Sequence, residues 1–139
     1  MARAQRGERE APQRLILDSG AVIALSRGEQ RARAFLARAL ELDALVEIPV
    51  VVVAETLRGG ARDAPVHRVI KAVGFVPAAS EVHGRTAGRL LGAARSSATV
   101  DALVVAHAVE VGGARILTGD REDLERLAAA HSEVWVQPL

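Results

Sequence analysis

The stretch Leu15-Ile16-Leu17-Asp18-Ser19-Gly20 decides how the chain begins to fold. It opens with a short apolar run, which ends in an acid and is followed at once by turn residues. This pattern predicts a buried strand at 15–17 that leads through a turn into a short helix at 21–26. The fold is therefore expected to start with a strand followed by a helix.

Strand and helix patterns alternate through the rest of the chain. Apolar residues at helical spacing, bounded by glycine and proline, predict further helices at 29–42, 49–58, 67–73, 80–95, 99–111 and 120–130. Short apolar runs predict further strands at 46–48, 74–76, 115–117 and 134–136. This alternation is typical of an α/β fold, so we expect a three-layer α/β/α sandwich around a mostly parallel sheet of about five strands.

The segment 49–58 contains four valines, which favour a strand. Pro49 precedes them and has no N–H to donate in the middle of a sheet. Proline does fit the first turn of a helix, and Gly59 and Gly60 supply a helix end. We therefore expect a helix here.

Residues 1–14 differ from the rest of the chain. They contain four arginines, Gly7 and Pro12, and no apolar periodicity. Such a segment is expected to form a flexible arm outside the core. The remaining residues, 15–139, have the length of one compact domain.

The composition excludes several classes of protein. The chain has no cysteine, which excludes disulfides, thiolate catalysis and cysteine-ligated zinc. Three aromatic residues (Phe35, Phe75 and Trp135) are too few for a platform on which bases stack. The longest uncharged apolar run, 48–54, is far shorter than the roughly 20 residues of a membrane span. No signal peptide is evident, so we expect a cytoplasmic protein without membrane contact.

Four carboxylates occupy the positions where an α/β sheet places its ligands. Asp18 and Asp120 follow the strands 15–17 and 115–117, and ligands of such sheets bind beyond the carboxyl ends of the strands. Asp101 and Glu55 each interrupt an otherwise apolar helix. Buried carboxylates are costly unless they are paired or bind a metal. The single lysine, Lys71, cannot pair with four acids, and an all-oxygen donor set favours Mg²⁺ or Mn²⁺.

Each acid also has a purely structural interpretation. Asp120 could cap the last helix, with Asp123 in the capping-box position, and Glu55 could pair with Arg58 three residues on. A structural role for all four at once is harder to reconcile with their placement at strand ends and inside apolar helices.

The histidines are expected to be structural or surface residues. His107 lies about 120° around its helix from Asp101, and Glu110 projects from the face opposite that acid. Neither is expected to join Asp101. His83 and His131 lie outside the acidic segments.

Four segments resemble the PIN-domain nucleases and, within them, the VapC toxins of type II toxin–antitoxin pairs. These segments are Leu17-Asp18-Ser19-Gly20-Ala21, Val53-Ala54-Glu55-Thr56-Leu57-Arg58-Gly59, Thr99-Val100-Asp101-Ala102-Leu103 and Leu117-Thr118-Gly119-Asp120-Arg121-Glu122-Asp123-Leu124. The resemblance spans residues 15–137 and places the four motifs in the order and spacing of the family.

The resemblance implies a PIN-like nuclease domain with a five-stranded parallel sheet and metal-dependent endoribonuclease activity. The family's acidic quartet corresponds to Asp18, Glu55, Asp101 and Asp120, which would bind Mg²⁺ or Mn²⁺ and carry the catalysis. Three supporting residues also match: Thr118 the hydroxyl that orients a metal ligand or water, Asp123 a variable additional acid, and Ser19 a position of the first motif.

The same resemblance implies an RNA substrate, a cognate antitoxin whose segment lies along the early helices, and a homodimer. Arginines beside the acidic site, namely Arg58, Arg62 and Arg68, are the candidates to hold RNA phosphates. Two other classes stay open: a non-catalytic PIN-like interaction module, and a phospho-receiver-like aspartate domain. The second requires a lysine at a strand end, and Lys71 is near no such site.

Overall fold

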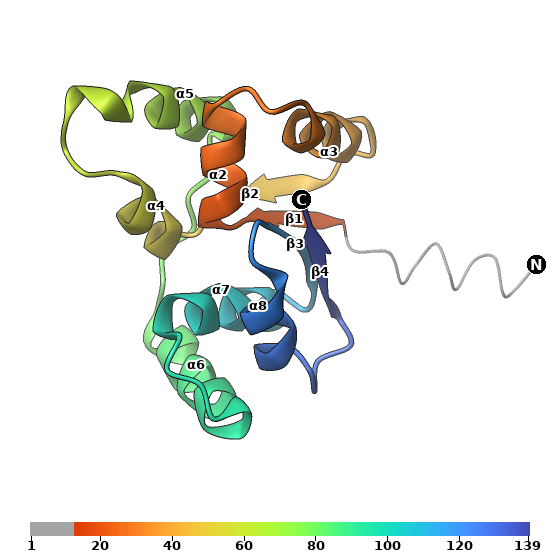
Figure 1. Ribbon diagram of the computed structural model, residues 1–139. Helices are drawn as coiled ribbons and strands as arrows, with labels where there is room; N and C mark the ends of the chain where they lie inside the picture. Colours follow the sequence, from red (N-terminus) through yellow and green to blue (C-terminus); the bar gives the residue numbers. More distant parts are fainter. Residues whose placement is uncertain (1–12) are drawn as a thin grey trace, which may run out of the picture.

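A computed structural model describes residues 13–139. Its centre is one parallel sheet in which the strands stand in the order β2-β1-β3-β4 (Figure 1). The strands are β1 (Arg14–Leu17), β2 (Leu45–Glu47), β3 (Ala114–Thr118) and β4 (Val134–Pro138). The expected α/β sandwich with a parallel sheet is confirmed.

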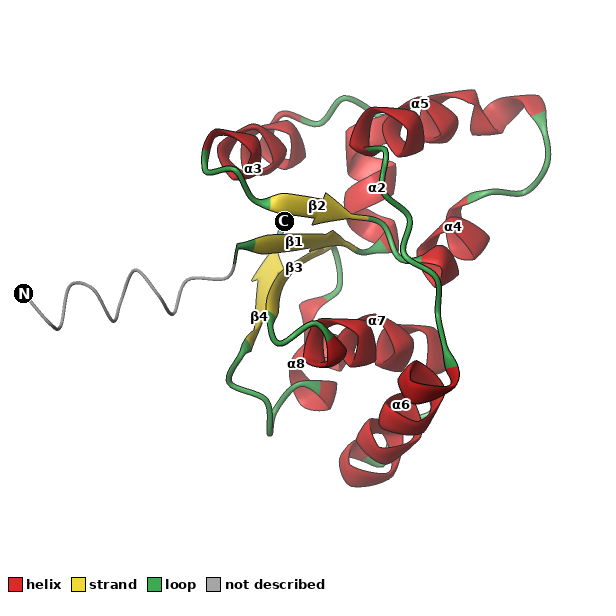
Figure 2. Ribbon diagram, turned by 180° about the vertical axis from the view of Figure 1, so that it is seen from behind, coloured by secondary structure: helices red, strands yellow, loops and turns green. Residues whose placement is uncertain are grey.

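Seven α-helices and one 3₁₀ turn surround the sheet in the described part of the chain. They are α2 (Ser19–Ser26), α3 (Gln30–Glu41), α4 (Val50–Thr56), η1 (Ala61–Asp63), α5 (Ala64–Val73), α6 (Glu81–Ala94), α7 (Thr99–Glu110) and α8 (Arg121–Leu127). Helices α2, α3 and α5 lie on one side of the sheet, and α7 and α8 lie on the other, with α6 packed outside α7 (Figures 1 and 2). None of the described helices is long and apolar enough to cross a membrane.

The two central strands and α7 form the centre of the core. Ile16, Leu17, Ile116 and Leu117 are fully buried because helices cover β1 and β3 on both faces. Burial of each such side chain contributes about 1.5–3 kcal/mol. The ends of β1 and β3 are therefore rigid points from which functional side chains can be positioned.

The strand expected at 74–76 is wrong, and the sheet has four strands. The segment does run beside the end of β2, since the Ile48 and Val50 N–H groups donate to the carbonyls of Phe75 (3.0 Å) and Pro77 (3.1 Å). A parallel ladder needs a donor in return from residue 77. Pro77 has no N–H, so the ladder cannot form.

Several helix limits also differ from the expected ones, whereas the helix after Pro49 is confirmed. Pro49 is its N-cap, and the Pro49 carbonyl accepts the Val52 N–H at 2.9 Å. Helix α5 begins at Ala64 rather than His67, because Pro65 fits the first turn of a helix. Helix α8 ends at Leu127, three residues before the expected end.

The arm expected at 1–14 lies outside the described residues up to residue 12. Arg14 is the first residue of β1, and its side chain forms an ion pair with Glu47 of β2. The ordered domain therefore includes Arg14.

Gly20 and Gly119 bring the loops after β1 and β3 into backbone contact. A Cβ at residue 20 would lie 2.8 Å from the Gly119 nitrogen and 3.1 Å from its Cα, closer than side-chain carbons approach backbone atoms. Gly20→Ala is therefore expected to destabilise the protein by about 1–3 kcal/mol, measured by urea unfolding.

Gly88→Ala is the matched control, because residue 88 also lies in a helix but a Cβ there meets open space. This substitution should stabilise the protein by about 0.5–1 kcal/mol through helix propensity. Equal effects of the two substitutions would contradict the close packing of the two loops.

Candidate active site

Thr118 joins the acids that follow the two central strands. Its hydroxyl donates a hydrogen bond to Asp18 Oδ2 (2.9 Å) and accepts one from the Asp120 N–H (3.0 Å). The Asp18 N–H in turn donates to the Leu117 carbonyl at 3.0 Å. The carboxyl ends of β1 and β3 are thus fixed to each other, and Asp18 and Asp120 lie on neighbouring loops.

Two carboxylate oxygens of the site are buried without a hydrogen-bond partner in the described residues. They are Asp18 Oδ1 and Glu55 Oε1, which come from the end of β1 and from α4. Buried polar atoms are nearly always bonded, and an unpaired carboxylate oxygen is especially costly. The pair therefore calls for a cation or water from outside the chain.

Asp101 provides the clearest evidence that the acids converge. Burial in the first turn of α7 raises its pKa to about 6, and the charges of four further acids raise it too. These acids are Asp18, Glu55, Asp123 and Asp120, in decreasing order of effect. Asp18, Glu55, Asp120 and Asp123 therefore all lie within electrostatic reach of Asp101.

The pKa values of Asp18 and Glu55 agree with this convergence. Burial raises the pKa of Asp18, as does the nearby charge of Asp120, against the hydrogen bonds from Ser19 and Thr118. Burial also raises the pKa of Glu55, with a further contribution from Asp18; Ser19 and Arg58 act in the opposite direction. Negative charge is thus concentrated where few cationic groups offset it.

The donor set fits a hydrated divalent cation. In the described part of the chain, no three His, Cys, Asp or Glu side chains are placed to hold a metal ion together directly. Mg²⁺, however, keeps several of its waters and needs only one or two carboxylates. The orphaned oxygens and the mutual repulsion of the acids are what such an ion would relieve.

The structural alternatives for Asp120 and Glu55 are not realised. Asp120 is the N-cap residue of α8, but its side chain makes no capping hydrogen bond. Arg58 directs its guanidinium to the Ala54 and Leu57 carbonyls, at 3.0 and 2.9 Å, and forms no ion pair with Glu55. Neither acid is therefore explained by local helix stabilisation.

Asp63 organises the loop after α4, and sequence reasoning missed it. Its Oδ2 accepts the N–H groups of Gly59 (2.7 Å) and Arg58 (2.8 Å), which hold the pKa of Asp63 below its usual value. The Gly-Gly pair followed by an acid was the available signal. Asp63 thereby positions Arg58 just beyond the end of the helix that carries Glu55.

The three candidate arginines lie in different places. Arg58 and Arg62 are exposed, at the end of α4 and in η1. Arg68 lines a groove together with Leu25 and Ser26, at the end of α2 away from Asp18. The eight residues of α2 separate these ends by roughly 12 Å. Arg58 is the better placed of the three to meet a substrate at the acids.

The described residues thus form a parallel α/β sandwich with acids beyond the ends of its two central strands. The model of the PIN domain family matches residues 15–130. The chain therefore belongs to the PIN domain family, a family of nucleases.

Solved structures of other proteins support the assignment of the fold. VapBC2 from Rickettsia felis, bound to a DNA fragment from its promoter, matches with a TM-score of 0.72 and 13% identity over 90% of this chain and 98% of that chain. A toxin–antitoxin complex from Klebsiella pneumoniae matches with a TM-score of 0.65 and 19% identity over 86% and 94% of the two chains. FitAcB from Neisseria gonorrhoeae matches with a TM-score of 0.63 and 20% identity over 88% and 95%. No curated protein matches the sequence.

Asp101→Asn is expected to stabilise the metal-free protein at pH 7.5. The pKa of Asp101 is about 6 in the folded state against 3.8 ordinarily, so folding stability falls as pH rises between these values. The amide removes this loss, and the gain should be about 1–2 kcal/mol after discounting for solvent around a half-exposed carboxyl. Urea unfolding in EDTA at pH 4 and 7.5 measures it, with little difference at pH 4.

Glu125→Gln is the control, because Glu125 is an exposed acid of α8. It should change stability by less than about 0.5 kcal/mol at both pH values. An Asp101→Asn protein that is less stable than wild type at pH 7.5 would show that the acids do not repel one another.

Proposed function

We propose that the protein is a Mg²⁺- or Mn²⁺-dependent endoribonuclease, the toxin of a toxin–antitoxin pair. The observation that carries the catalytic part is the convergence of Asp18, Glu55, Asp101 and Asp120, two of which have orphaned buried oxygens. Hydrolysis of a phosphodiester develops negative charge on the phosphoryl and leaving oxygens. A bound divalent cation stabilises that charge and activates water.

Each acid has a distinct role in this proposal. Asp18 and Asp120 would hold the cation directly, since they follow adjacent strands and share Thr118. Thr118 keeps one Asp18 oxygen occupied and so turns the orphaned oxygen toward the ion. Glu55 and Asp101 would bind through water or position the attacking water. Asp123 adds charge at the rim.

The substrate phosphates need basic side chains at the edge of this acidic site. Arg58 is the first candidate, because Asp63 fixes its backbone next to α4. Arg62 lies in the adjoining turn, whereas Arg68 would meet only a more extended RNA. With few aromatic residues, recognition should depend on the shape and phosphates of the RNA.

Asp18→Asn is the test of the catalytic proposal. Wild type should cleave RNA with Mn²⁺ or Mg²⁺, and EDTA should abolish the cleavage. The amide removes one charge at nearly constant shape and should lower the rate by about 100-fold or more. Gel analysis of a labelled RNA pool measures both effects.

Glu122→Gln is a suitable control, because it removes an exposed acid two residues from Asp120 that no contact ties to the site. It should keep cleavage close to that of wild type. Wild-type activity in the Asp18→Asn variant would exclude the proposed site. RNA binding without metal-dependent cleavage would instead favour a non-catalytic interaction module.

The antitoxin part of the proposal is supported by the fold and by a groove. One of the solved structures of similar fold is a toxin–antitoxin complex from Klebsiella pneumoniae. A groove of about 250 Å³ lies between α2, α3 and α5, the early helices expected to receive an antitoxin. It is lined by Leu25, Ser26, Arg33, Leu36, Pro65, Arg68, Val69, Ala72 and Val73. Two arginines in an apolar groove favour an amphipathic segment that carries acidic residues.

A homodimer also belongs to this proposal. Large apolar side chains available for self-association are exposed on several parts of the chain, and on two of these parts they are close together in sequence. Leu40 and Leu42 lie at the end of α3, and Phe75, Val76 and Val82 lie on the segment leading into α6.

Ala72→Glu tests the groove. Ala72 is exposed and lines the groove, so a carboxylate there should repel an acidic segment without disturbing the core. Co-expression with the product of the reading frame next to its gene should give a complex for wild type and at least about tenfold weaker binding for Ala72→Glu. Ala129→Glu, exposed after α8, should bind like wild type. Equal binding by both variants would place the partner elsewhere.

A further inference from the structure

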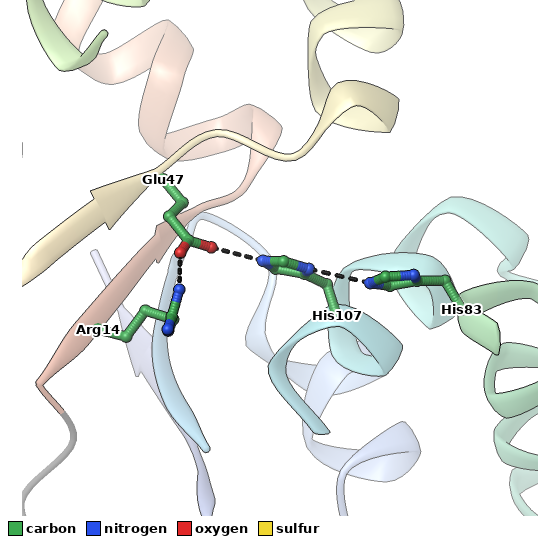
Figure 3. Close-up of polar contacts among 4 residues, drawn as sticks. All are labelled: Arg14, Glu47, His83 and His107. Atoms are coloured by element: carbon green, nitrogen blue, oxygen red, sulfur yellow. Dashed lines mark hydrogen bonds and ion pairs between the residues drawn. The ribbon is translucent and has the colours of Figure 1, made fainter. Parts of the chain in front are cut away.

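A continuous chain of polar contacts runs through the molecule away from the acidic site (Figure 3). Arg14 of β1 and His107 of α7 bind the two carboxylate oxygens of Glu47, which is fully buried on β2. On the other side of His107, its Nδ1 lies 3.1 Å from Nε2 of His83 on α6. The two imidazole rings lie nearly parallel, with centroids 5.3 Å apart and planes at 18°.

The contact with Ser80 determines which ring nitrogen of each histidine carries the proton. Ser80 precedes α6 as the N-cap residue, and its backbone N–H donates to His83 Nδ1 at 3.2 Å. A nitrogen that accepts from an N–H carries no proton, so the proton of a neutral His83 is on Nε2. That N–H donates to His107 Nδ1, which leaves the His107 proton on Nε2, where it donates to Glu47.

This arrangement satisfies every ring nitrogen and the Ser80 N–H together only while both imidazoles are neutral. One added proton would put N–H groups on both nitrogens of one ring. On His83, the added proton would be on Nδ1 and would face the Ser80 N–H. On His107, it would be on Nδ1 and would face the His83 Nε2–H. If His83 changed tautomer to avoid this, its proton would move to Nδ1 and again face the Ser80 N–H. The Ser80 hydroxyl, 2.8 Å from His83 Nδ1, can accept such a proton, but the Ser80 N–H then loses its acceptor.

We propose that Ser80, His83, His107 and Glu47 form a proton-sensitive latch that holds the start of α6 on α7 when both imidazoles are neutral and releases it when the pair binds a proton. The first turn of α6 is the part that opens, because its capping box is made by Ser80 and His83. Helix α7 stays anchored, because His107 Nε2–H donates to the buried Glu47 carboxylate in either state.

The other charged groups near the two rings bind partners outside the latch. The charge of Glu110 on α7 raises the pKa of His83, and the Glu110 carboxylate accepts the Thr86 hydroxyl at 2.6 Å. Arg89 of α6 donates to the same hydroxyl. From α8, Arg126 reaches the Ala94 carbonyl at the far end of α6.

The remaining elements around the rings contribute little charge. Glu81 and Arg85 form an exposed ion pair on the outer face of α6. From β3, Arg115 stacks on Trp135. The small cavity beside the rings, about 10 Å³, is lined otherwise by apolar residues such as Val50, Val51 and Leu103. It has room for about one water.

The direction of the pKa of His83 agrees with the latch. Burial lowers this pKa first, the neighbouring His107 lowers it further, and Glu110 opposes the shift. A histidine with a lowered folded pKa binds its proton more readily in the open state. The stability of the closed latch is therefore complete above the ordinary value of 6.5 and is lost as pH falls through the folded pKa.

His83→Gln separates the latch from a merely structural contact. Glutamine at this position is an ordinary capping-box residue, which accepts the Ser80 N–H through its amide oxygen and cannot be protonated. His131→Gln is the matched control, because His131 lies outside the latch and pairs with Glu133 near the surface. The measurement is the hydrogen-exchange protection of the Gly84 amide, which donates to the Ser80 carbonyl at 3.2 Å across the first turn of α6. It is corrected for intrinsic exchange and followed between pH 7.5 and 5.

Wild type and His131→Gln should lose protection as pH falls below 6.5, by up to about tenfold per pH unit, the limit for one proton bound on opening. His83→Gln should keep its protection within about twofold. The same loss in His83→Gln as in wild type would overturn the proposal. So would nitrogen NMR of wild type that finds a proton on His83 Nδ1 at pH 7.5, a result that does not depend on any variant.

Discussion

The hydroxyl of Thr118 is the contact on which the acidic site depends. Through it the end of β3 binds both the Asp18 carboxylate and the Asp120 backbone, so two loops that are far apart in sequence have one geometry. The contact of Gly20 with Gly119 brings the same two loops together without side chains between them. Parallel strands with buried apolar side chains make this junction rigid, and α4 and α7 then add Glu55 and Asp101 to it.

The acids place mutually repelling negative charges in an otherwise well-packed domain. Burial and mutual repulsion raise the pKa of Asp101 to about 6, which a domain selected for stability alone would avoid. Perturbed pKa values of this kind are found in proteins mainly where function requires them. The chain belongs to the PIN domain family, a family of nucleases. In the function proposed above, a bound cation would offset this negative charge. The buried Glu47 differs, because Arg14 and His107 occupy both of its oxygens.

The sequence predicted those features that are written in local patterns. The helix after Pro49 followed from a missing donor. Among the candidate acids, Asp18 and Asp120 were chosen because they follow strands, whereas Asp101 and Glu55 were chosen because they interrupt apolar helices. The features that the sequence did not predict depend on partners distant in the chain. No residue near His83 in the sequence indicates that His83 contacts His107. The strand expected at 74–76 does not form, because the returning hydrogen bond would need an N–H at residue 77, which is a proline. The role of Asp63 likewise depends on a loop conformation that its neighbours alone do not specify.

The same Pro77 segment has a consequence for how the molecule behaves among its own copies. The outer side of β2 is an open edge to which another strand could add, a common route to aggregation. Here the carbonyls of Phe75 and Pro77 occupy the donors of Ile48 and Val50 just past the strand, while the proline offers none of its own. Strand β2 itself is three residues long. This edge therefore gives a poor template for sheet extension, and the protein can expose apolar side chains nearby with less risk of forming fibres.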